Sequence, residues 1–460
     1  MSVNKSCEVC PTEETLAPES YRNWGRALGR RLRAQAKFVV GGELRPDSPA
    51  RLEALTAGLT DVGMQVVDVG LLPAPMIFYA HRRLRADGCA MVTANHDPDG
   101  QAGLRWMLGD ELPGPEDIAL LQREAEKPRR AARKKGARRS LDITFDYVAW
   151  LQETWVDSLT LHRRIVLDPR HGSLSAKARR YLQAVFPHCL FSAIHDTPEG
   201  QPRELSADGS RPESLRELCD AVYHQKADLG IAFDSRGERL AFVDEEGMPL
   251  SAEEAVCVFL ESLGSEVIDA PFVYDHHFSR RVPEIAGTLK ARPLAERNHQ
   301  ALLRRRMRET KAIFGAQTSG RYFFRALEGG DDGLFAACWL IAWLGHRGAP
   351  LSELRRRCPA VFITPELRVA LTAPKHAAAL KRVSQAWSGH SQSKLDGVRI
   401  EFPDGWALTR SCPAQQELAF RFEADNWPSL QQVVWRFCEV LDDLGDQVWM
   451  RYTAWTGSQE

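Results

Sequence analysis

The sequence lacks the features that would place the chain in a membrane or in an oxidising compartment. No run of about 18 apolar residues is present, which argues against a membrane-spanning helix. The first ten residues, MSVNKSCEVC, contain no apolar stretch of the kind that a secretory signal peptide requires. The ten cysteines are scattered, a pattern typical of reduced thiols rather than of a disulfide framework. We therefore expect a cytoplasmic protein with no membrane partner.

The chain also lacks an excess of charge of either sign. Sixty Lys and Arg against 61 Asp and Glu leave a net charge of -1, so no general nucleic-acid partner is expected. Only residues 129–139, RRAARKKGARR, concentrate basic side chains. This run is typical of a solvated linker, and a phosphate-bearing ligand or an acidic partner is the alternative. Cys7 and Cys10 have zinc-ligand spacing, but no second such pair completes a zinc site.

Short apolar strands alternating with amphipathic helices are what the sequence has in abundance. KFVVGG (37–42) predicts a strand, and a helix with Ser48 as its N-cap and Gly63 as its stop follows before the strand MQVVDVG. This order predicts a βαβ unit with a parallel sheet. At 460 residues the chain is long enough for several such units.

The same alternation of strands and helices recurs twice before the sequence pattern changes. RIVLD (164–168) and ADLGIAFD (227–234) predict buried strands, and GLFAACWLIAWLG predicts an apolar helix that ends at Gly345. After about residue 361, GVRIEF, GWALTR and ELAFRFEA alternate like antiparallel strands, and one terminal helix follows from WPSLQQVVWRF to Gly445. The predicted fold class is α/β: three related α/β domains with mixed sheets, then a C-terminal α+β domain.

Four loops in a fixed order carry a resemblance to a known family. Residues 93–98, 234–239, 316–321 and 410–416 are similar to the active-site loops of the α-D-phosphohexomutases, and most closely to the phosphomannomutase/phosphoglucomutase group. The resemblance implies four domains arranged as a heart around one central cleft. We place these domains at residues 1–140, 141–247, 248–360 and 361–460. It also implies a phosphoserine that exchanges its phosphoryl group with a hexose phosphate.

The first loop departs from the family at its nucleophile. The family pattern T-A-S-H-N-P is here TANHDP, so Asn95 stands where the phosphoserine is expected. An amide forms no useful phosphoester, and loss of a nucleophile elsewhere lowers turnover by about six decades. His96 then has no hydroxyl to deprotonate. Asp97 is the one alternative carrier, because its carboxylate could take a phosphoryl group as an acyl phosphate.

The second loop departs at its metal ligands. The family pattern D-G-D-x-D-R holds one magnesium ion by three carboxylates, whereas this chain has Asp234, Arg236 and Glu238 at those positions. A guanidinium group repels a divalent cation, so no metal cofactor is expected. Arg236 either lies between the two carboxylates and replaces the ion, or points into solvent.

The remaining loops keep part of their family pattern. Gln317, Ser319 and Arg321 stand in the sugar-recognition loop, and Arg410 begins a phosphate loop in which Pro413 removes one backbone N–H. In the N-terminal D-I-R-G segment, Val9 replaces the arginine. Residual ligand binding is predicted at the following residues: Arg239, Gln317, Ser319, Arg321, Arg410 and Arg421.

These departures predict a pseudoenzyme of the phosphohexomutase fold. On this hypothesis the chain is not an enzyme and has a binding or regulatory role in hexose-phosphate or polysaccharide metabolism, with a hexose phosphate, an active mutase or a glycan-pathway protein as its partner. The alternative is a weakly active phosphohexomutase that interconverts hexose 1-phosphate and hexose 6-phosphate, and only this alternative calls for Mg2+.

Overall fold

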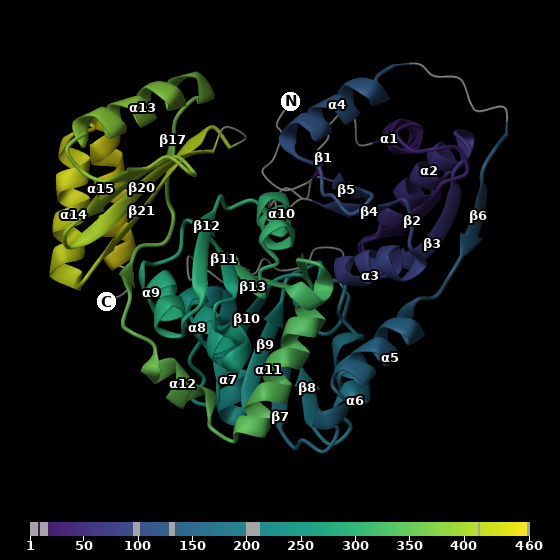
Figure 1. The fold of residues 1–460 in the computed structure, drawn as a ribbon, viewed down its shortest axis with the longest axis horizontal. Helices are drawn as coiled ribbons and strands as arrows, with labels where there is room; N and C mark the ends of the chain where they lie inside the picture. Colours follow the sequence, from purple (N-terminus) through teal and green to yellow (C-terminus); the bar gives the residue numbers. More distant parts are fainter. Residues whose placement is uncertain are drawn as a thin grey trace.

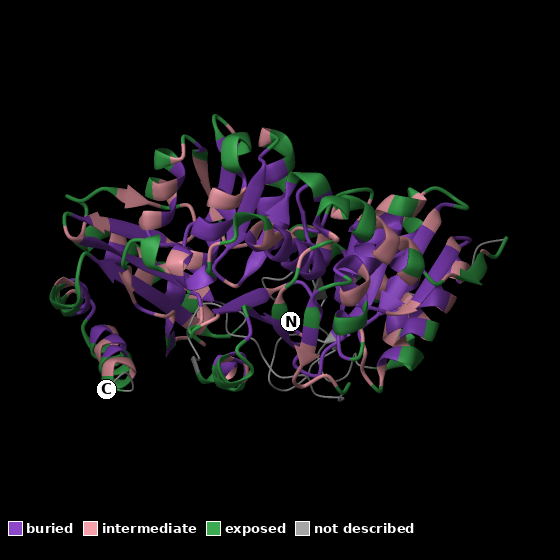
Figure 2. Cartoon of the chain, turned by 90° about the horizontal axis from the view of Figure 1, so that it is seen from below, coloured by how far each residue is buried: buried purple, intermediate pink, exposed green. Residues whose placement is uncertain are grey.

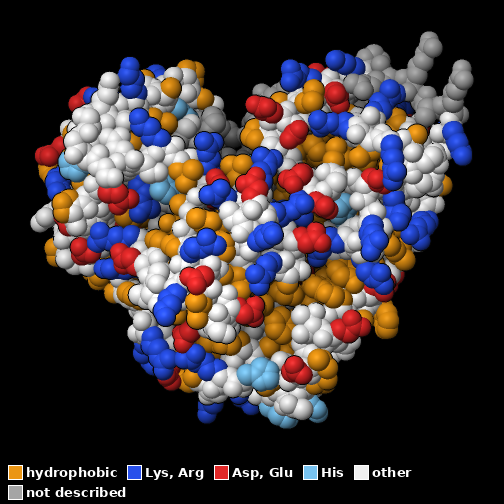
Figure 3. Space-filling model, in the orientation of Figure 1, with side chains coloured by type: hydrophobic (Ala, Val, Ile, Leu, Met, Phe, Trp, Pro, Cys, Tyr) orange, Lys and Arg blue, Asp and Glu red, His pale blue; other side chains and the backbone are white. Residues whose placement is uncertain are grey.

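The computed structural model describes residues 8–9, 17–94, 102–127, 134–198, 212–412 and 415–457. Four units, each built on its own sheet, follow one another along the chain (Figure 1). The space-filling view has the outline of a heart, with a notch between the lobe that carries α13 and the lobe that carries α4 (Figure 3). The predicted fold class is therefore confirmed.

The first unit is a six-stranded sheet flanked by helices. Its strand order is β1-β5-β4-β2-β3-β6, and β2 runs parallel to both β3 and β4, whereas β5 is antiparallel to β4. The strands are β1 (Glu8–Val9), β2 (Lys37–Gly42), β3 (Gln65–Leu71), β4 (Gly88–Ala94), β5 (Ala102–Leu108) and β6 (Ala137–Ser140). The helices are α1 (Pro18–Arg30), α2 (Ser48–Asp61), α3 (Ala74–Leu84) and α4 (Pro115–Ala125).

The second and third units repeat the α/β arrangement with mixed sheets. The second has the order β10-β9-β7-β8, with β7 (Arg164–Asp168), β8 (Leu190–Ala193), β9 (Leu229–Phe233) and β10 (Leu240–Asp244). Its helices are α5 (Thr144–Thr154), α6 (Ala178–Val185) and α7 (Arg216–Gln225). The third has the order β12-β11-β13-β14-β15, with β11 (Pro271–Asp275), β12 (Arg292–Glu296), β13 (Phe314–Gln317), β14 (Arg321–Phe324) and β15 (Gly330–Asp331). Its helices are α8 (Ala252–Ser262), α9 (Arg281–Thr288), α10 (Gln300–Thr310), α11 (Gly333–Arg347) and α12 (Leu351–Arg357).

The fourth unit is an antiparallel sheet, as the alternating pattern predicts, and it carries three helices. β21 pairs with β16, β17 and β20, and β19 joins β20 to β18. The strands are β16 (Phe362–Ile363), β17 (Leu367–Ala370), β18 (Gln392–Ser393), β19 (Val398–Phe402), β20 (Gly405–Cys412) and β21 (Glu417–Ala424). The helices are α13 (Ala373–Ala386), α14 (Trp427–Glu439) and α15 (Asp443–Gly457).

The buried apolar residues follow the sheets (Figure 2). One large core runs through the first three units and includes Val39, Ile165 and Phe314, whereas the fourth unit has a separate core around Phe420 and Phe437. The first three units are thus packed together by shared apolar surface. Among the described residues, no helix combines the length and the apolar character that crossing a bilayer requires.

Several local predictions need correction. Asp47 precedes the second helix, and Ser48 is already its first helical residue. The helix α11 passes through Gly345 and ends at Arg347, where Gly348 follows with a φ of 73°. The single terminal helix is two helices, because the chain turns between α14 and α15 with Asp442 at a φ of 47°. Residues 137–139 of the basic run lie in β6, so this part is not a linker.

Candidate active site

A tight turn between β9 and β10 carries the three residues that the sequence places at the metal loop. Asp234 Oδ1 accepts hydrogen bonds from the backbone N–H groups of Glu238, at 2.7 Å, and Arg239, at 3.1 Å. Gly237 has a φ of +74°, a conformation that favours glycine. Asp234 therefore stabilises the turn itself through backbone hydrogen bonds.

Glu238 lies at the centre of a buried ion-pair cluster. Its Oε1 accepts a hydrogen bond from Arg105 of β5, and its Oε2 accepts one from Arg321 of β14 at 3.0 Å. Arg236 Nε lies 3.2 Å from Glu238 Oε2 as a further ion pair. Glu238 is 1% exposed and Arg236 is 0% exposed. Arg236 therefore does not point into solvent: it pairs with Glu238, one of the two carboxylates between which it was expected. Its replacement of a metal ion stays a prediction.

Two further side chains close this cluster into a ring. Arg105 donates to Gln300 Oε1 at 2.6 Å, and Gln300 Nε2 donates to Asp331 Oδ1 at 2.8 Å. Arg321 pairs with Asp331 through its other terminal nitrogen. We call the five side chains the interdomain ring: Arg105, Glu238, Gln300, Arg321 and Asp331. Because they come from the first three units, the ring joins those units at one buried point.

The electrostatics of the ring are set by burial and by its arginines. Burial by itself would raise the pKa of Glu238, but Arg105, Arg321 and Arg236 outweigh it and hold the pKa well below the usual range. Burial lowers the pKa of Arg236 to about 9. Burial, together with the nearby charge of Glu238, raises the pKa of Asp234. The Glu238 carboxylate is thus ionised and compensated by guanidinium groups.

The residues of this turn do not fit the magnesium ion that the family resemblance implies. Mg2+ takes oxygen ligands in near-octahedral geometry, and carboxylates normally supply the charge. Here both oxygens of Glu238 already accept from arginines, and a guanidinium group occupies the third position. Within the described part of the chain, no group of three or more His, Cys, Asp or Glu side chains is arranged to hold a metal ion.

The loop at residues 316–321, which resembles the family's sugar-recognition loop, lies directly beside this turn. Arg239 and Arg321 form a β-bridge, and Leu240 N–H donates to Gly320 C=O at 2.9 Å. Arg321 is 3% exposed within the ring, whereas Arg239 and Ser319 are half-buried. Of these side chains, Arg239 and Ser319 are the ones that a ligand can reach.

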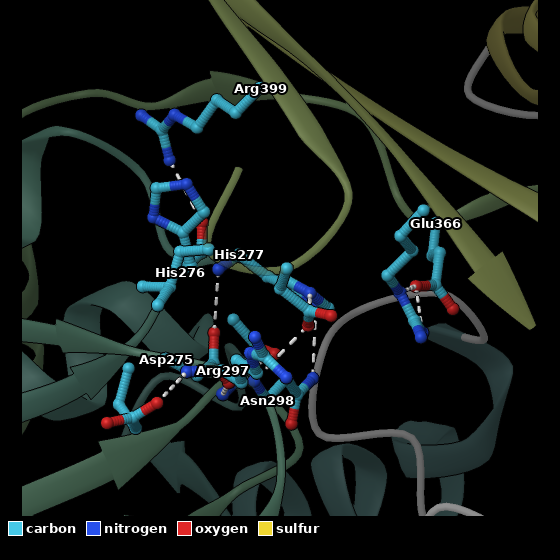
Figure 4. Close-up of polar contacts among 12 residues, drawn as sticks. Asp275, His276, His277, Arg297, Asn298, Glu366 and Arg399 are labelled. Carbon is cyan, nitrogen blue, oxygen red and sulfur yellow. Dashed lines mark hydrogen bonds and ion pairs between the residues drawn. The ribbon is translucent and has the colours of Figure 1, made fainter. Parts of the chain in front are cut away.

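Gln317 belongs to a second series of polar side-chain contacts, outside the interdomain ring. Its Nε2 donates to Asn298 Oδ1 at 2.7 Å, and Asn298 Nδ2 lies 3.0 Å from His277 Nδ1 (Figure 4). His277 Nε2 in turn lies 2.9 Å from Asp396 Oδ2, in the turn before β19. These contacts connect the third unit to the fourth.

Arg410 and Arg421 are both engaged with carboxylates. Arg410 pairs with Glu366 (Figure 4), and Arg410 together with His277 lowers the pKa of that carboxyl to about 2 even though burial alone would raise it. Arg421 donates to Thr364 C=O at 3.1 Å and lies 3.5 Å from Glu253. Neither contacts the interdomain ring. Their predicted binding of a ligand stays a prediction.

The predicted carrier loop is described only at its edge. Asn95, His96 and Asp97 lie outside the described residues, as do Cys7, Cys10 and Pro413. The preceding strand β4 ends at Ala94, and Thr93 Oγ1 donates to Glu43 at 2.9 Å.

Comparison with known proteins places these loops in a family. Sequence profiles described as phosphoglucomutase/phosphomannomutase, alpha/beta/alpha domains I, II and III match residues 9–129, 146–247 and 269–362. The chain belongs to the α-D-phosphohexomutase family. The resemblance seen in the sequence is thereby confirmed, while the four domain boundaries stay a prediction.

Several relatives of this phosphohexomutase-family chain are similar over almost their full length. A phosphomannomutase/phosphoglucomutase of Pseudomonas aeruginosa is 28% identical over 426 residues, which cover 91% of each chain. A phosphoglucomutase of Neisseria gonorrhoeae is 27% identical, with 95% of each chain covered. The crystal structure of a phosphoglucomutase/phosphomannomutase family protein from Burkholderia thailandensis matches 98% of each chain with a TM-score of 0.84 and 26% identity.

The prediction that the chain is not an enzyme is wrong in the light of these relatives. The similar proteins from Pseudomonas and Neisseria are named as mutases, and nothing in the described structure shows that this chain is inactive. The prediction took departures in five loops, among them the missing serine, to mean the loss of all chemistry. Physically that step does not follow, because a neighbouring carboxylate is also a nucleophile, and guanidinium groups also compensate charge.

Three ring members were not predicted from the sequence: Arg105, Gln300 and Asp331. Arg105 lies in the apolar stretch AGLRWML of β5, and a charged residue inside such a strand is the signal that could have found it. Gln300 gives no such signal, because it is 195 residues away from Arg105 and meets it only through the packing of two units.

Proposed function

We propose that this phosphohexomutase-family chain interconverts hexose 1-phosphate and hexose 6-phosphate by phosphoryl transfer. The observation that carries the proposal is the similarity to a named mutase over 91% of both chains. The interdomain ring also supports it, because the ring joins the first three units, which carry three of the four predicted loops. A fungal relative by fold, N-acetylphosphoglucosamine mutase of Aspergillus fumigatus, was solved in complex with GlcNAc-6P and magnesium. Its identity of 11% supports the fold alone.

The phosphoryl carrier in this proposal is Asp97. A carboxylate oxygen of Asp97 attacks the phosphorus of a hexose bisphosphate, the bond from phosphorus to the sugar oxygen breaks, and that oxygen takes up a proton. The free hydroxyl of a bound hexose phosphate then attacks the phosphorus of the acyl phosphate and gives up its proton. The bond from phosphorus to the carboxylate oxygen breaks, which restores both the carboxylate and a hexose bisphosphate. Asn95 does not take this role, because an amide has no nucleophilic oxygen of this kind.

Arg239 and Ser319 are the substrate-binding residues in this proposal. They are half-buried on two adjacent turns, so their donors can reach a ligand that the buried ring cannot contact. A guanidinium group binds phosphate or sugar hydroxyls as a planar donor, and a hydroxyl both donates and accepts. The ring behind them supplies rigidity rather than direct contact.

Phosphorus NMR of glucose 1-phosphate and mannose 1-phosphate, with a trace of glucose 1,6-bisphosphate, tests the function. We expect the 6-phosphate signal to grow with the protein and to stay absent without it, at a turnover below the range of about 1–1000 per second of ordinary enzymes. Asp97→Asn should abolish product, whereas Asp220→Asn, an exposed control on α7, should leave the rate unchanged.

Two results would contradict the proposal in different ways. No 6-phosphate from any hexose 1-phosphate would overturn the function itself. Equal turnover by the Asp97→Asn variant and the unaltered chain would keep the function but remove Asp97 as the carrier.

A further inference from the structure

The turn at residues 234–239 is where the family resemblance and the contacts of this chain disagree. The resemblance implies three carboxylates around a divalent cation. In this chain the Glu238 carboxylate has accepted two hydrogen bonds and one further ion pair, all from arginines. A metal ion could bind Glu238 only by displacing buried guanidinium groups, each of which would then lack its anion.

The charges of the buried groups already cancel without a metal ion. Three carboxylates face three guanidinium groups: Asp234, Glu238 and Asp331, and Arg105, Arg236 and Arg321. Arg239 adds one more positive charge nearby, which acts on both Asp234 and Arg236. A divalent cation would therefore bring two positive charges into a site that needs none.

We infer that the turn functions without a divalent cation and that the buried Arg236 guanidinium supplies the fixed positive charge at this place. Unlike a bound ion, this charge cannot dissociate or be removed by a chelator. It is also covalently part of the second unit, and it contacts the same carboxylate oxygen as Arg321 of the third unit. The positive charge at this turn is therefore in place once the chain has folded. The inference holds whether or not the chain is a mutase.

The direct test is a Mn2+ titration, in which the loss of the EPR signal of free Mn2+ measures binding. We expect the protein at millimolar Mn2+ to show no saturable site that depends on Asp234, so the unaltered chain and the Asp234→Asn variant should give the same isotherm. Thermal unfolding should agree, because a cation present at 100 times its dissociation constant would add about 2.7 kcal/mol to the free energy of unfolding. We expect the same midpoint in Mg2+ and in EDTA.

The converse experiment restores the carboxylate that the family resemblance implies, and it should produce Mn2+ binding. Arg236→Asp should create a saturable Mn2+ site, whereas Ser235→Asp, which adds the same carboxylate one residue earlier and keeps Arg236, should not. Circular dichroism establishes that the variants are folded.

One stoichiometric Mn2+ site in the unaltered chain, lost in Asp234→Asn, would overturn the inference. So would a folded Arg236→Asp variant that binds no Mn2+, because Arg236 would then not be what excludes the ion. If Arg236→Asp does not fold, the isotherms of the unaltered chain and of Asp234→Asn still decide. None of these results depends on turnover, so the inference and the proposed function fail separately.

Discussion

Replacing Glu238 by glutamine removes one negative charge from the interdomain ring at nearly constant volume. The side chain of Glu238 is 0% exposed, and those of its partners Arg105 and Arg321 are 1% and 4% exposed. Solvent therefore cannot take over the role of the carboxylate. The change leaves buried guanidinium groups from three different units without their common anion.

The expected loss of stability is about 3–5 kcal/mol, the usual cost of removing one partner of a buried ion pair. The three contacts share one carboxylate, so their effects do not add and a larger value is not expected. Since the pKa of folded Glu238 lies well below its unfolded value, this stability is present above the unfolded pKa and is lost only as the pH falls through the lower, folded value. The loss caused by Glu238→Gln should therefore be the same at pH 7 and pH 5.5.

Urea unfolding followed by circular dichroism measures the loss, with Glu246→Gln as the matched control. Glu246 also pairs with two arginines, Arg355 and Arg356, but its side chain is 44% exposed. Its replacement should change stability by less than about 1 kcal/mol. If Glu238→Gln were no more destabilising than Glu246→Gln, the ring would not be holding the three units together, and our reasoning about it would be refuted.

Two other perturbations follow from the packing and from a buried carboxyl group. Burial raises the pKa of Asp332, which accepts from Tyr147, to about 6, so its contribution to stability should fall by about 2 kcal/mol as the pH rises from 4 to 6. Asp332→Asn should remove that fall, and urea midpoints at several pH values would show whether it does. Gly58→Ala should destabilise by about 1–3 kcal/mol, because its Cβ would lie 2.0 Å from Arg22 C=O where α1 and α2 meet. Gly287→Ala, whose Cβ meets nothing within 4 Å, should be neutral or stabilising by up to about 1 kcal/mol, and equal thermal midpoints for the two variants would contradict the packing argument.

Strands were predictable from the sequence because their apolar runs are short and bounded. KFVVGG became β2 over the predicted residues, and RIVLD became β7. Helix ends were less predictable, because a glycine has more than one use. Gly345 does not end α11. It lies in the last turn of the helix, where a Cβ would come within 2.4 Å of Leu161, so the glycine allows close packing there.

The terminal helix shows the same ambiguity. Gly445 was taken as its end, yet it lies inside α15, where a Cβ would come within 2.0 Å of Cys438 C=O of α14. A glycine required by contact with a second helix looks the same in the sequence as a glycine required by a left-handed turn. Only the packing of the two helices distinguishes them.

The residues in the turns of the candidate site were predictable from the sequence, whereas the contacts between residues of different units were not. Asp234, Arg236 and Glu238 were found because residues 234–239 resemble the metal loop of the family in a single short stretch of sequence. Their partners come from distant segments, such as Arg105, which is 133 residues from Glu238. Local patterns carry no information about that distance, since the packing of one sheet on another decides it.

Intact-mass analysis of the chain after exposure to glucose 1,6-bisphosphate tests most directly whether it is a phosphoryl carrier. We predict the addition of one phosphoryl group, which hydroxylamine removes because it is an acyl phosphate, and no addition in the Asp97→Asn variant. An unchanged mass under every condition that supports the 6-phosphate assay would show that the chain is not a phosphoryl carrier.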